Sequence, residues 1–121
     1  MRIRVTSIDD GPAAPGLAAA VPFEAEVVRR LPGPDRPDYW LVALDGPVTC
    51  GDRVVCHLVV APAWEGCDLS PGATGVPLAI AYVTDDSLLT DAALSFDKAV
   101  PVTLGTADVA RAANPKARRR T

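Results

Sequence analysis

Short runs in which apolar and polar residues alternate are the main feature of this 121-residue chain. Arg2–Ile8 and Phe23–Arg30 alternate with a period of two, as a β-strand does when one face lies on a core and the other in water. Ala99–Gly105 alternates in the same way. Pro101 within this run lacks a backbone N–H, so we predict that this strand lies at the edge of a sheet.

Three further runs are apolar rather than alternating. Tyr39–Leu44, Arg53–Val60 and Val76–Val83 are too short for typical helices and rich in the β-branched and aromatic residues that suit strands. Arg53–Val60 is apolar on both of its faces, so we expect a central strand that is covered on both sides. In the third run, Ala79 and Ala81 leave little side-chain volume on one face.

The connections between these runs are rich in turn-forming residues. Leu31–Asp38 contains three prolines, which cannot join a sheet ladder, so we interpret it as a stiff, exposed hairpin connection. Asp45–Pro47 predicts a turn, and residues 11–22 and Ala61–Gly75 predict loops. The strand runs are therefore well separated from one another.

Helix is expected only in short pieces. We predict single turns at Ala18–Ala20 and Asp91–Leu94, and a short C-terminal helix over Thr106–Asn114 that ends before a proline. About six strands with almost no helix predict an all-β fold, a small antiparallel β-barrel with a β-sandwich as the alternative. Residues 1–105 would form the barrel, and residues 106–121 a short helix and a disordered basic tail.

Composition narrows the class of protein. With 49% apolar residues, one compact domain is expected rather than a disordered chain. No window of 18 apolar residues exists, so no membrane span is predicted. Residues 11–22 are broken by prolines and do not resemble a signal peptide, which predicts a cytoplasmic protein.

Cys50, Cys56 and Cys67 are odd in number, so they cannot all pair within one chain, and we interpret them as free thiols.

Charge is divided unevenly along the chain. Residues 1–105 carry a net charge of −7 and residues 106–121 a net charge of +4, which together give the overall −3. An acidic body repels a phosphate backbone and attracts cationic ligands or basic proteins. The alternative interpretation of this charge is solubility alone.

His57 is the only histidine, and it falls in the predicted central strand. It could serve as an acid, a base or a ligand, or it could be a partly buried histidine bonded to the backbone. Cys56 beside it would point to the opposite face of the strand, so the two cannot form a nucleophile–base pair. No zinc-ligand spacing surrounds His57, so we expect no metal and no cofactor.

The aspartates are the other reactive groups. Most of them, Asp86 included, fall in predicted turns, where aspartate makes local hydrogen bonds. His57 and Asp86 are therefore the weak candidates for catalysis, since acid–base chemistry would require folding to bring such groups together.

Aromatic and acidic residues also gather around the Pro-rich connection. Tyr39, Trp40 and Trp64 lie at the start of a strand or in a loop, where aromatic residues often anchor partners, although they could instead cover the end of a barrel. With Asp35 and Asp38, they form our candidate binding surface.

These observations favour a non-enzymatic binding module that recognises a basic protein partner or a small cationic ligand, such as an inhibitor, immunity-type or accessory protein. The alternative is a small β-barrel enzyme or ligand carrier with His57 and aspartates in an interior pocket. A third hypothesis is nonspecific nucleic-acid contact through Arg118–Arg120. No strand mixes aromatic and basic residues, so no specific nucleic-acid binding is expected. The edge at Ala99–Gly105 could also pair with a second copy and give a homodimer.

Overall fold

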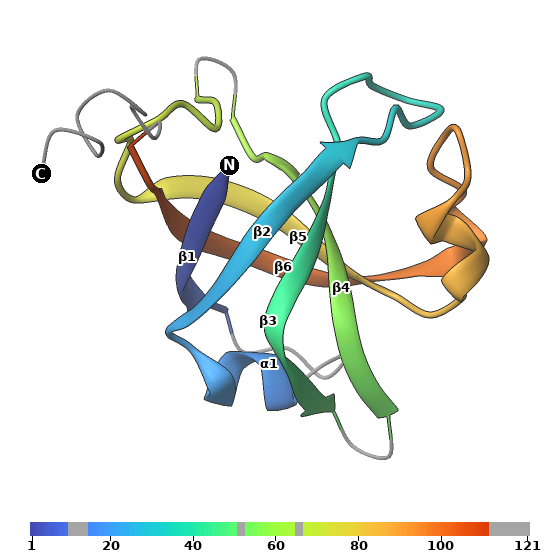
Figure 1. The fold of residues 1–121 in the computed structure, drawn as a ribbon, viewed down its shortest axis with the longest axis horizontal. Helices are drawn as coiled ribbons and strands as arrows, with labels where there is room; N and C mark the ends of the chain where they lie inside the picture. The colour runs from blue at the N-terminus through green and yellow to red at the C-terminus, as the bar shows by residue number, and fades with distance from the viewer. Residues whose placement is uncertain (10–14, 51–52, 65–66, 112–121) are drawn as a thin grey trace, which may run out of the picture.

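Six antiparallel strands close into a barrel in the computed structural model, which describes residues 1–9, 15–50, 53–64 and 67–111 (Figure 1). Each strand pairs with the next along the chain, and the last strand pairs back with the first. The strands are β1 (Arg2–Ile8), β2 (Phe23–Arg30), β3 (Trp40–Cys50), β4 (Arg53–Pro62), β5 (Val76–Val83) and β6 (Ala99–Val109). The predicted antiparallel barrel is therefore confirmed, and β1, β2 and β5 have the predicted bounds.

β3 is longer than predicted, and the turn expected at Asp45–Pro47 is wrong. These residues lie within β3, where the register with β4 shifts between Ala43 and Val48. Ala43 faces His57 and Val48 faces Val55, so residues 44–47 lie opposite a single residue of β4. The turn-forming residues thus produce a bulge in the ladder rather than a reversal of the chain.

β6 also continues further than predicted, through Thr106–Val109. The helix expected over Thr106–Asn114 is not confirmed, because Ala107 and Val109 are buried in the barrel and continue the period-two alternation. Pairing with two neighbouring strands outweighs the capping signal at Thr106. The predicted basic tail, Lys116–Thr121, lies outside the described residues.

The edge position predicted for β6 is wrong for the strand as a whole, since β6 pairs with both β5 and β1. The proline nevertheless has the expected local setting. β1 pairs only with Gly105–Val109, whereas Pro101 pairs with Ala81 of β5 on one side. Pro101 therefore lies in the half of β6 that extends beyond β1, where a missing N–H is tolerated.

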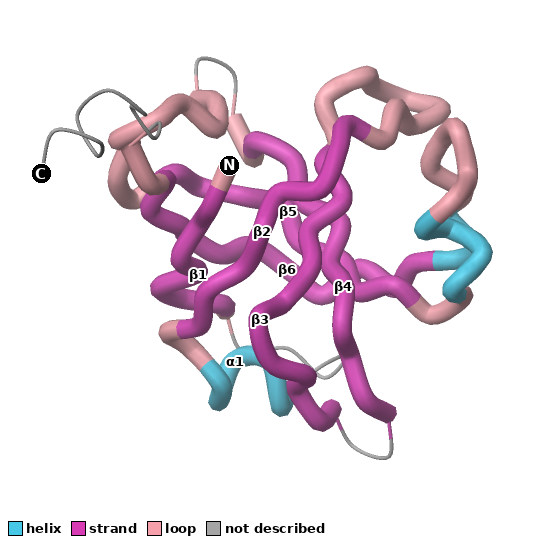
Figure 2. Tube along the Cα trace, in the orientation of Figure 1, coloured by secondary structure: helices cyan, strands magenta, loops and turns pink. Residues whose placement is uncertain are grey.

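The helices are short and lie around the barrel (Figure 2). α1 (Pro15–Ala20) contains the predicted turn and is longer by three residues. The turn predicted at Asp91–Leu94 is wrong, because 3₁₀-helices lie on either side of it, η1 (Asp86–Leu89) and η2 (Phe96–Lys98). Asp85 caps η1 by accepting a 2.9 Å hydrogen bond from the Ser87 N–H. Of the helices in the described ranges, none has the length and apolar character needed to cross a membrane.

An inner core fills the barrel. Its members come from all six strands, from α1, where Leu17 is fully buried, and from the connection between β4 and β5, where Leu69 is 6% exposed. The inner core consists of Ile3, Val5, Ile8, Leu17, Ala25, Val27, Val42, Cys50, Val55, Leu58, Val60, Leu69, Val76, Leu78, Ile80, Tyr82, Ala107 and Val109. Among the described residues no charged or polar residue is buried, so the interior is apolar throughout.

α1 can pack this closely only because of a glycine. A Cβ atom on Gly16 would lie 2.1 Å from the carbonyl oxygen of Thr49, a distance that real Cβ atoms do not reach. Gly16 therefore allows α1 to approach β3 and to place Leu17 in the inner core.

A second apolar cluster, the outer core, lies on the outward face of the barrel. It consists of Leu31, Leu41, Val59, Leu88, Leu94 and Ala99. On β4, Leu58 and Val60 enter the inner core while Val59 enters the outer core. The prediction of a strand covered on both sides is thus confirmed for this half of β4, but Val54 in the other half is 60% exposed.

Candidate functional site

The connection between β5 and β6, residues 84–98, covers part of the outward face of the barrel. We call it the outer segment; it lies beside the Pro-rich connection, residues 31–38 (Figure 1). The Leu94 N–H donates a 2.7 Å hydrogen bond to the Pro32 carbonyl, which joins the two. The Leu31 N–H donates to the Tyr39 carbonyl at 2.9 Å and closes the base of the Pro-rich connection. The Pro-rich connection, which was predicted to be stiff and exposed, is therefore held in place by backbone hydrogen bonds.

A guanidinium group from the barrel holds the outer segment. Arg29 on β2 donates through one nitrogen to three carbonyls, those of Leu88 at 3.2 Å, Leu89 at 3.0 Å and Asp91 at 2.6 Å. The Asp91 side chain also forms a 2.7 Å ion pair with Lys98, and its hydrogen bond raises the pKa of Lys98. Polar contacts as well as apolar packing thus hold the outer segment to the barrel.

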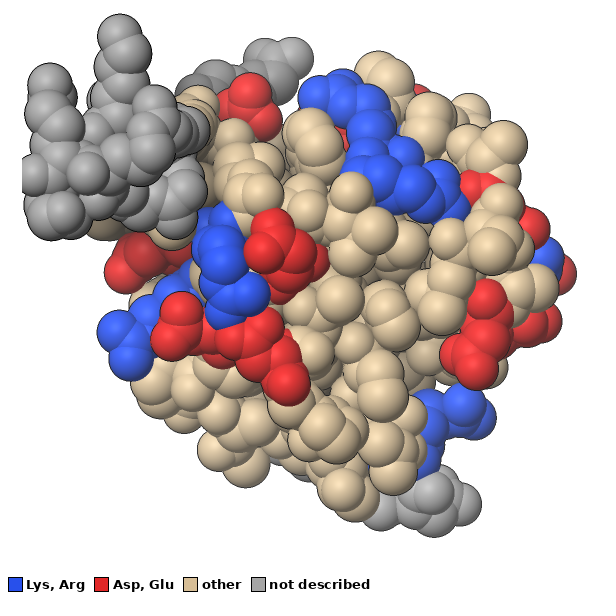
Figure 3. Space-filling view, in the orientation of Figure 1, with Lys and Arg blue, Asp and Glu red and all other residues tan. Residues whose placement is uncertain are grey.

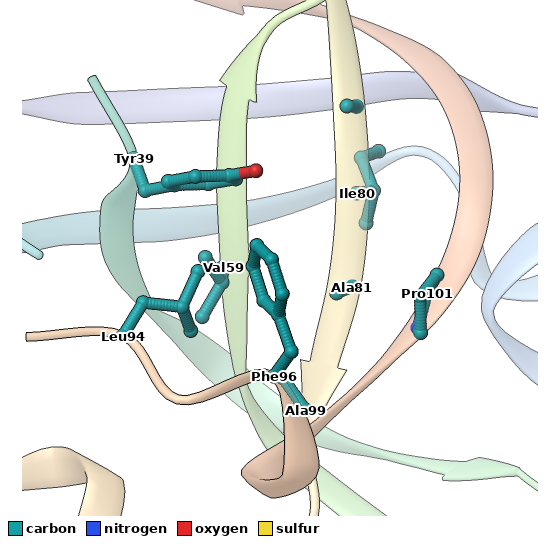
Figure 4. Close-up of a pocket in the computed structure, with 9 residues that line it drawn as sticks. Tyr39, Val59, Ile80, Ala81, Leu94, Phe96, Ala99 and Pro101 are labelled. Atoms are coloured by element: carbon teal, nitrogen blue, oxygen red, sulfur yellow. The ribbon is translucent and has the colours of Figure 1, made fainter. Parts of the chain in front are cut away.

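A groove of about 300 Å³ opens between these segments and the barrel wall (Figure 4). Its lining residues come from β4, β5, β6, the outer segment and Tyr39. They are Tyr39, Val59, Ala79, Ile80, Ala81, Leu94, Phe96, Ala99 and Pro101. Because Ala79 and Ala81 are small, the outward face of β5 leaves space that larger side chains would fill.

Two aromatic rings of the lining pack against each other. Tyr39 and Phe96 pack edge to face, with ring centroids 6.1 Å apart and an interplanar angle of 76°. The Tyr39 hydroxyl donates a 3.1 Å hydrogen bond to Asp35, and burial together with this bond raises the pKa of Tyr39. Gly33 lies against the same ring, since a Cβ atom there would be 2.5 Å from it. The Tyr39 ring is therefore fixed, whereas Phe96 is 53% exposed.

The two segments that flank the groove are acidic. The Pro-rich connection and the outer segment together carry six aspartates, one arginine and one lysine, a net charge of −4. Arg36 forms a bidentate ion pair with Asp38 and lowers the pKa of Asp38. Lys98 forms an ion pair with Asp91. Asp35, Asp85, Asp86 and Asp97 have no ion-pair partner within the described part of the chain.

The face formed by β1 and β2 has a different charge pattern. There, acidic and basic side chains are interleaved, as Figure 3 shows. Arg2 contacts Glu24, Glu26 and Asp45, and the N-terminal amine pairs with Glu26 at 2.8 Å. Opposite charges neutralise one another on that face, whereas beside the groove four aspartates have no ion-pair partner in the described part of the chain and Arg29 adds a positive charge at the outer segment.

The predicted binding residues separate into two groups. Asp35 and Tyr39 lie at the groove, and Asp38 lies nearby in its ion pair with Arg36. Trp40 and Trp64 are not among the lining residues. Trp40 packs against the inner core, with the Arg30 guanidinium 4.4 Å from its ring centroid, and Trp64 is 61% exposed in the connection after β4. The structure therefore brings Tyr39 and Asp35 to one site and leaves both tryptophans outside it.

The weak catalytic candidates are not brought together at the groove. His57 is half-buried on β4 opposite Ala43, and Asp86 is exposed in η1. Neither lines the groove, where Tyr39 is the one ionisable residue of the lining. Among the residues that the structure describes, no three His, Cys, Asp or Glu side chains converge to hold a metal. The groove is therefore suited to binding an apolar group and carries no acid–base pair.

The three cysteines are free thiols in different settings. Cys50 is buried in the inner core, and this burial raises its pKa. Cys56 is exposed on β4, and the half-buried Cys67 donates a 2.8 Å hydrogen bond to the Trp64 carbonyl. None of them lines the groove.

Sequence reasoning missed Leu94, Phe96 and Pro101 as site residues. The available signal was the pair of alanines on one face of an otherwise bulky strand, Ala79 and Ala81, which form the floor of the groove. The side chains that meet above this floor come from segments far apart in sequence, so no local pattern could indicate them.

Known proteins provide no guide to this site. The chain matches no family model, no curated protein and no solved structure.

Proposed function

We propose that this protein is a non-enzymatic binding module that recognises a basic protein partner or a small cationic ligand at the groove. The observation that carries the proposal is an apolar groove with an aromatic mouth, flanked by segments of net charge −4. Apolar surface supplies binding free energy, and unpaired carboxylates attract cations and disfavour anionic partners. An inhibitor, an immunity-type protein and an accessory subunit all fit this chemistry.

The stiffness of the groove supports the same proposal. The Leu94–Pro32 hydrogen bond, the contact of Gly33 with the Tyr39 ring and the three bonds from Arg29 fix both walls. A site that is ordered before binding loses less conformational entropy when a partner arrives.

The carboxylates are expected to contribute unequally. Asp38 is already bound by Arg36, so its charge is largely neutralised. Asp35 and Asp97 have no such partner in the described part of the chain. Asp35 accepts a hydrogen bond from the Tyr39 hydroxyl, and Asp97 is the next residue in the sequence after Phe96. We therefore expect Asp35 and Asp97 to attract the cation more strongly than Asp38.

The test uses a hexalysine peptide, titrated by calorimetry at low and at physiological ionic strength. We expect the double variant Asp35→Asn, Asp97→Asn to bind about fivefold more weakly than the wild type at low salt. Binding of both proteins should weaken as salt is added, because exposed charges are screened.

The matched control removes two exposed carboxylates outside the flanking segments, Glu24 and Asp68, with Glu24→Gln and Asp68→Asn. Its net charge equals that of the test variant. Equal losses in the two double variants would show that overall charge and not this site attracts the peptide, and would contradict the proposal.

A further inference from the structure

The size and the lining of the groove favour one kind of partner among those with a positive charge. We infer that it holds one apolar side chain of a protein partner, so that the partner is recognised by an exposed apolar residue flanked by lysine or arginine. This inference rests on the proposed function and selects a protein segment over a small cationic ligand.

The size of the groove supports a single side chain. Its volume of about 300 Å³ is at the lower limit of small-molecule sites, which range from about 300 to 1,000 Å³. An apolar cavity of about 150 Å³ accommodates a benzene molecule. A leucine, methionine or phenylalanine side chain therefore fits within the groove, which is small compared with most sites for drug-sized ligands.

The chemistry of the lining supports the same choice. Small-molecule sites use several convergent polar groups to orient the ligand. Here the lining side chains are apolar except for the Tyr39 hydroxyl, and that hydroxyl already donates to Asp35. An anchoring side chain needs no such groups, because the rest of its own chain is held outside the groove.

The flanking charges would hold that chain. Asp35 accepts a hydrogen bond from the Tyr39 hydroxyl, and Asp97 follows Phe96 in η2. Cationic side chains beside an apolar anchor would therefore have two unpaired carboxylates to contact, Asp35 and Asp97. Charged residues around an apolar anchor are the arrangement that protein interfaces use for specificity.

The experiment compares three capped pentapeptides, with leucine flanked by two lysines on each side, alanine in the same lysine flanks, and leucine in glutamate flanks. Binding is followed by the NMR methyl signals of Ala79 and Ala81. We expect the leucine–lysine peptide to bind about tenfold more tightly than the alanine–lysine peptide, since burial of the larger side chain adds apolar contact. Only leucine peptides should shift the two methyl signals strongly.

A filled groove should remove this preference. We expect Ala81→Leu to bind the leucine–lysine and alanine–lysine peptides equally, whereas Ala19→Leu, at an exposed position of α1, should keep the tenfold difference. Phe96→Ala removes one wall of the groove at a position that is 53% exposed, and it should also abolish the preference for leucine over alanine.

The outcomes separate the two proposals. Equal affinity of the wild type for leucine and alanine in lysine flanks would overturn the side-chain anchor and leave the basic partner supported by the hexalysine test. Equal affinity of the leucine peptides with lysine flanks and with glutamate flanks would support the anchor and overturn the basic partner. A tenfold preference that survives in both Ala81→Leu and Phe96→Ala would overturn the assignment of the anchor to this groove.

Discussion

The inner core and the outer core differ in which elements cover them from solvent. Both consist of aliphatic side chains, and both contain residues of β4, with Leu58 in one and Val59 in the other. The inner core is enclosed by all strands, with Leu17 from α1 and Leu69 from the β4–β5 connection added to it. The outer core is covered by the Pro-rich connection and the outer segment, and beside it the groove stays open.

The two faces of β5 differ in the size of their side chains. On the inward face of β5, Leu78, Ile80 and Tyr82 fill the barrel. On its outward face, Ala79 and Ala81 leave the groove. Large residues inside stabilise the fold, and small residues outside leave apolar surface available to a partner.

The largest effect is expected from Leu58→Ala in the inner core. Leu58 is fully buried, and its truncation should lower the free energy of unfolding by about 3 kcal/mol through lost burial and a remaining cavity. Denaturant unfolding measures the change. Val54→Ala on the same strand, at a position that is 60% exposed, should change it by less than about 0.5 kcal/mol.

A smaller and more local effect is expected from Leu88→Ala in the outer core. Leu88 is also fully buried, but the outer segment can detach while the barrel stays folded, so we expect a loss of about 2 kcal/mol. Hydrogen exchange should show that amides of residues 84–98 lose protection before those of the strands. Loss of protection across the whole barrel at once would contradict the distinction between the two cores.

Arg29→Met tests the polar attachment of the outer segment. The substitution keeps most of the apolar stem and removes the group that donates to three carbonyls, at a cost of about 1 kcal/mol. Amide hydrogen exchange in residues 84–98 should accelerate, and the leucine–lysine pentapeptide should bind more weakly at the groove. Arg4→Met, at an exposed position of β1, is the control and should leave both unchanged.

The smallest effect is expected on acidification. The ion pair with Arg36 lowers the pKa of Asp38, so its stabilising contribution is complete above the pKa of the unfolded chain, about 4, and is lost as pH falls through the lowered value. The stability difference between the wild type and Asp38→Asn should therefore be present at neutral pH and vanish in acid. A difference that stays constant over this range would show that the ion pair does not stabilise the Pro-rich connection.

Much of the barrel could be predicted from the sequence because its strands carry local signals. β1 and β2 alternate over most of their length, and this period predicts that Ile3, Val5, Ala25 and Val27 face the core. The errors fell where pairing partners decide the outcome. Asp45–Pro47 has the composition of a turn and Thr106 that of a cap, yet both lie in strands that gain ladder hydrogen bonds and burial.

The groove could be predicted only in part. Tyr39 and Asp35 were indicated by their place beside a strand start, whereas the small size of Ala79 and Ala81 was noted but not connected with a site. Phe96 reaches the site because the outer segment folds back over the barrel, which depends on contacts such as Leu94 with Pro32. Such contacts between distant segments leave no periodic pattern in the sequence.

Intermolecular nuclear Overhauser effects from the leucine–lysine pentapeptide test the central claim most directly. We predict contacts from the leucine methyl groups to the Tyr39 and Phe96 rings and to the Ala81 methyl group. Contacts to Trp64 or Val54 in their place would show that the apolar anchor binds elsewhere, and would contradict the assignment of the groove as the binding site.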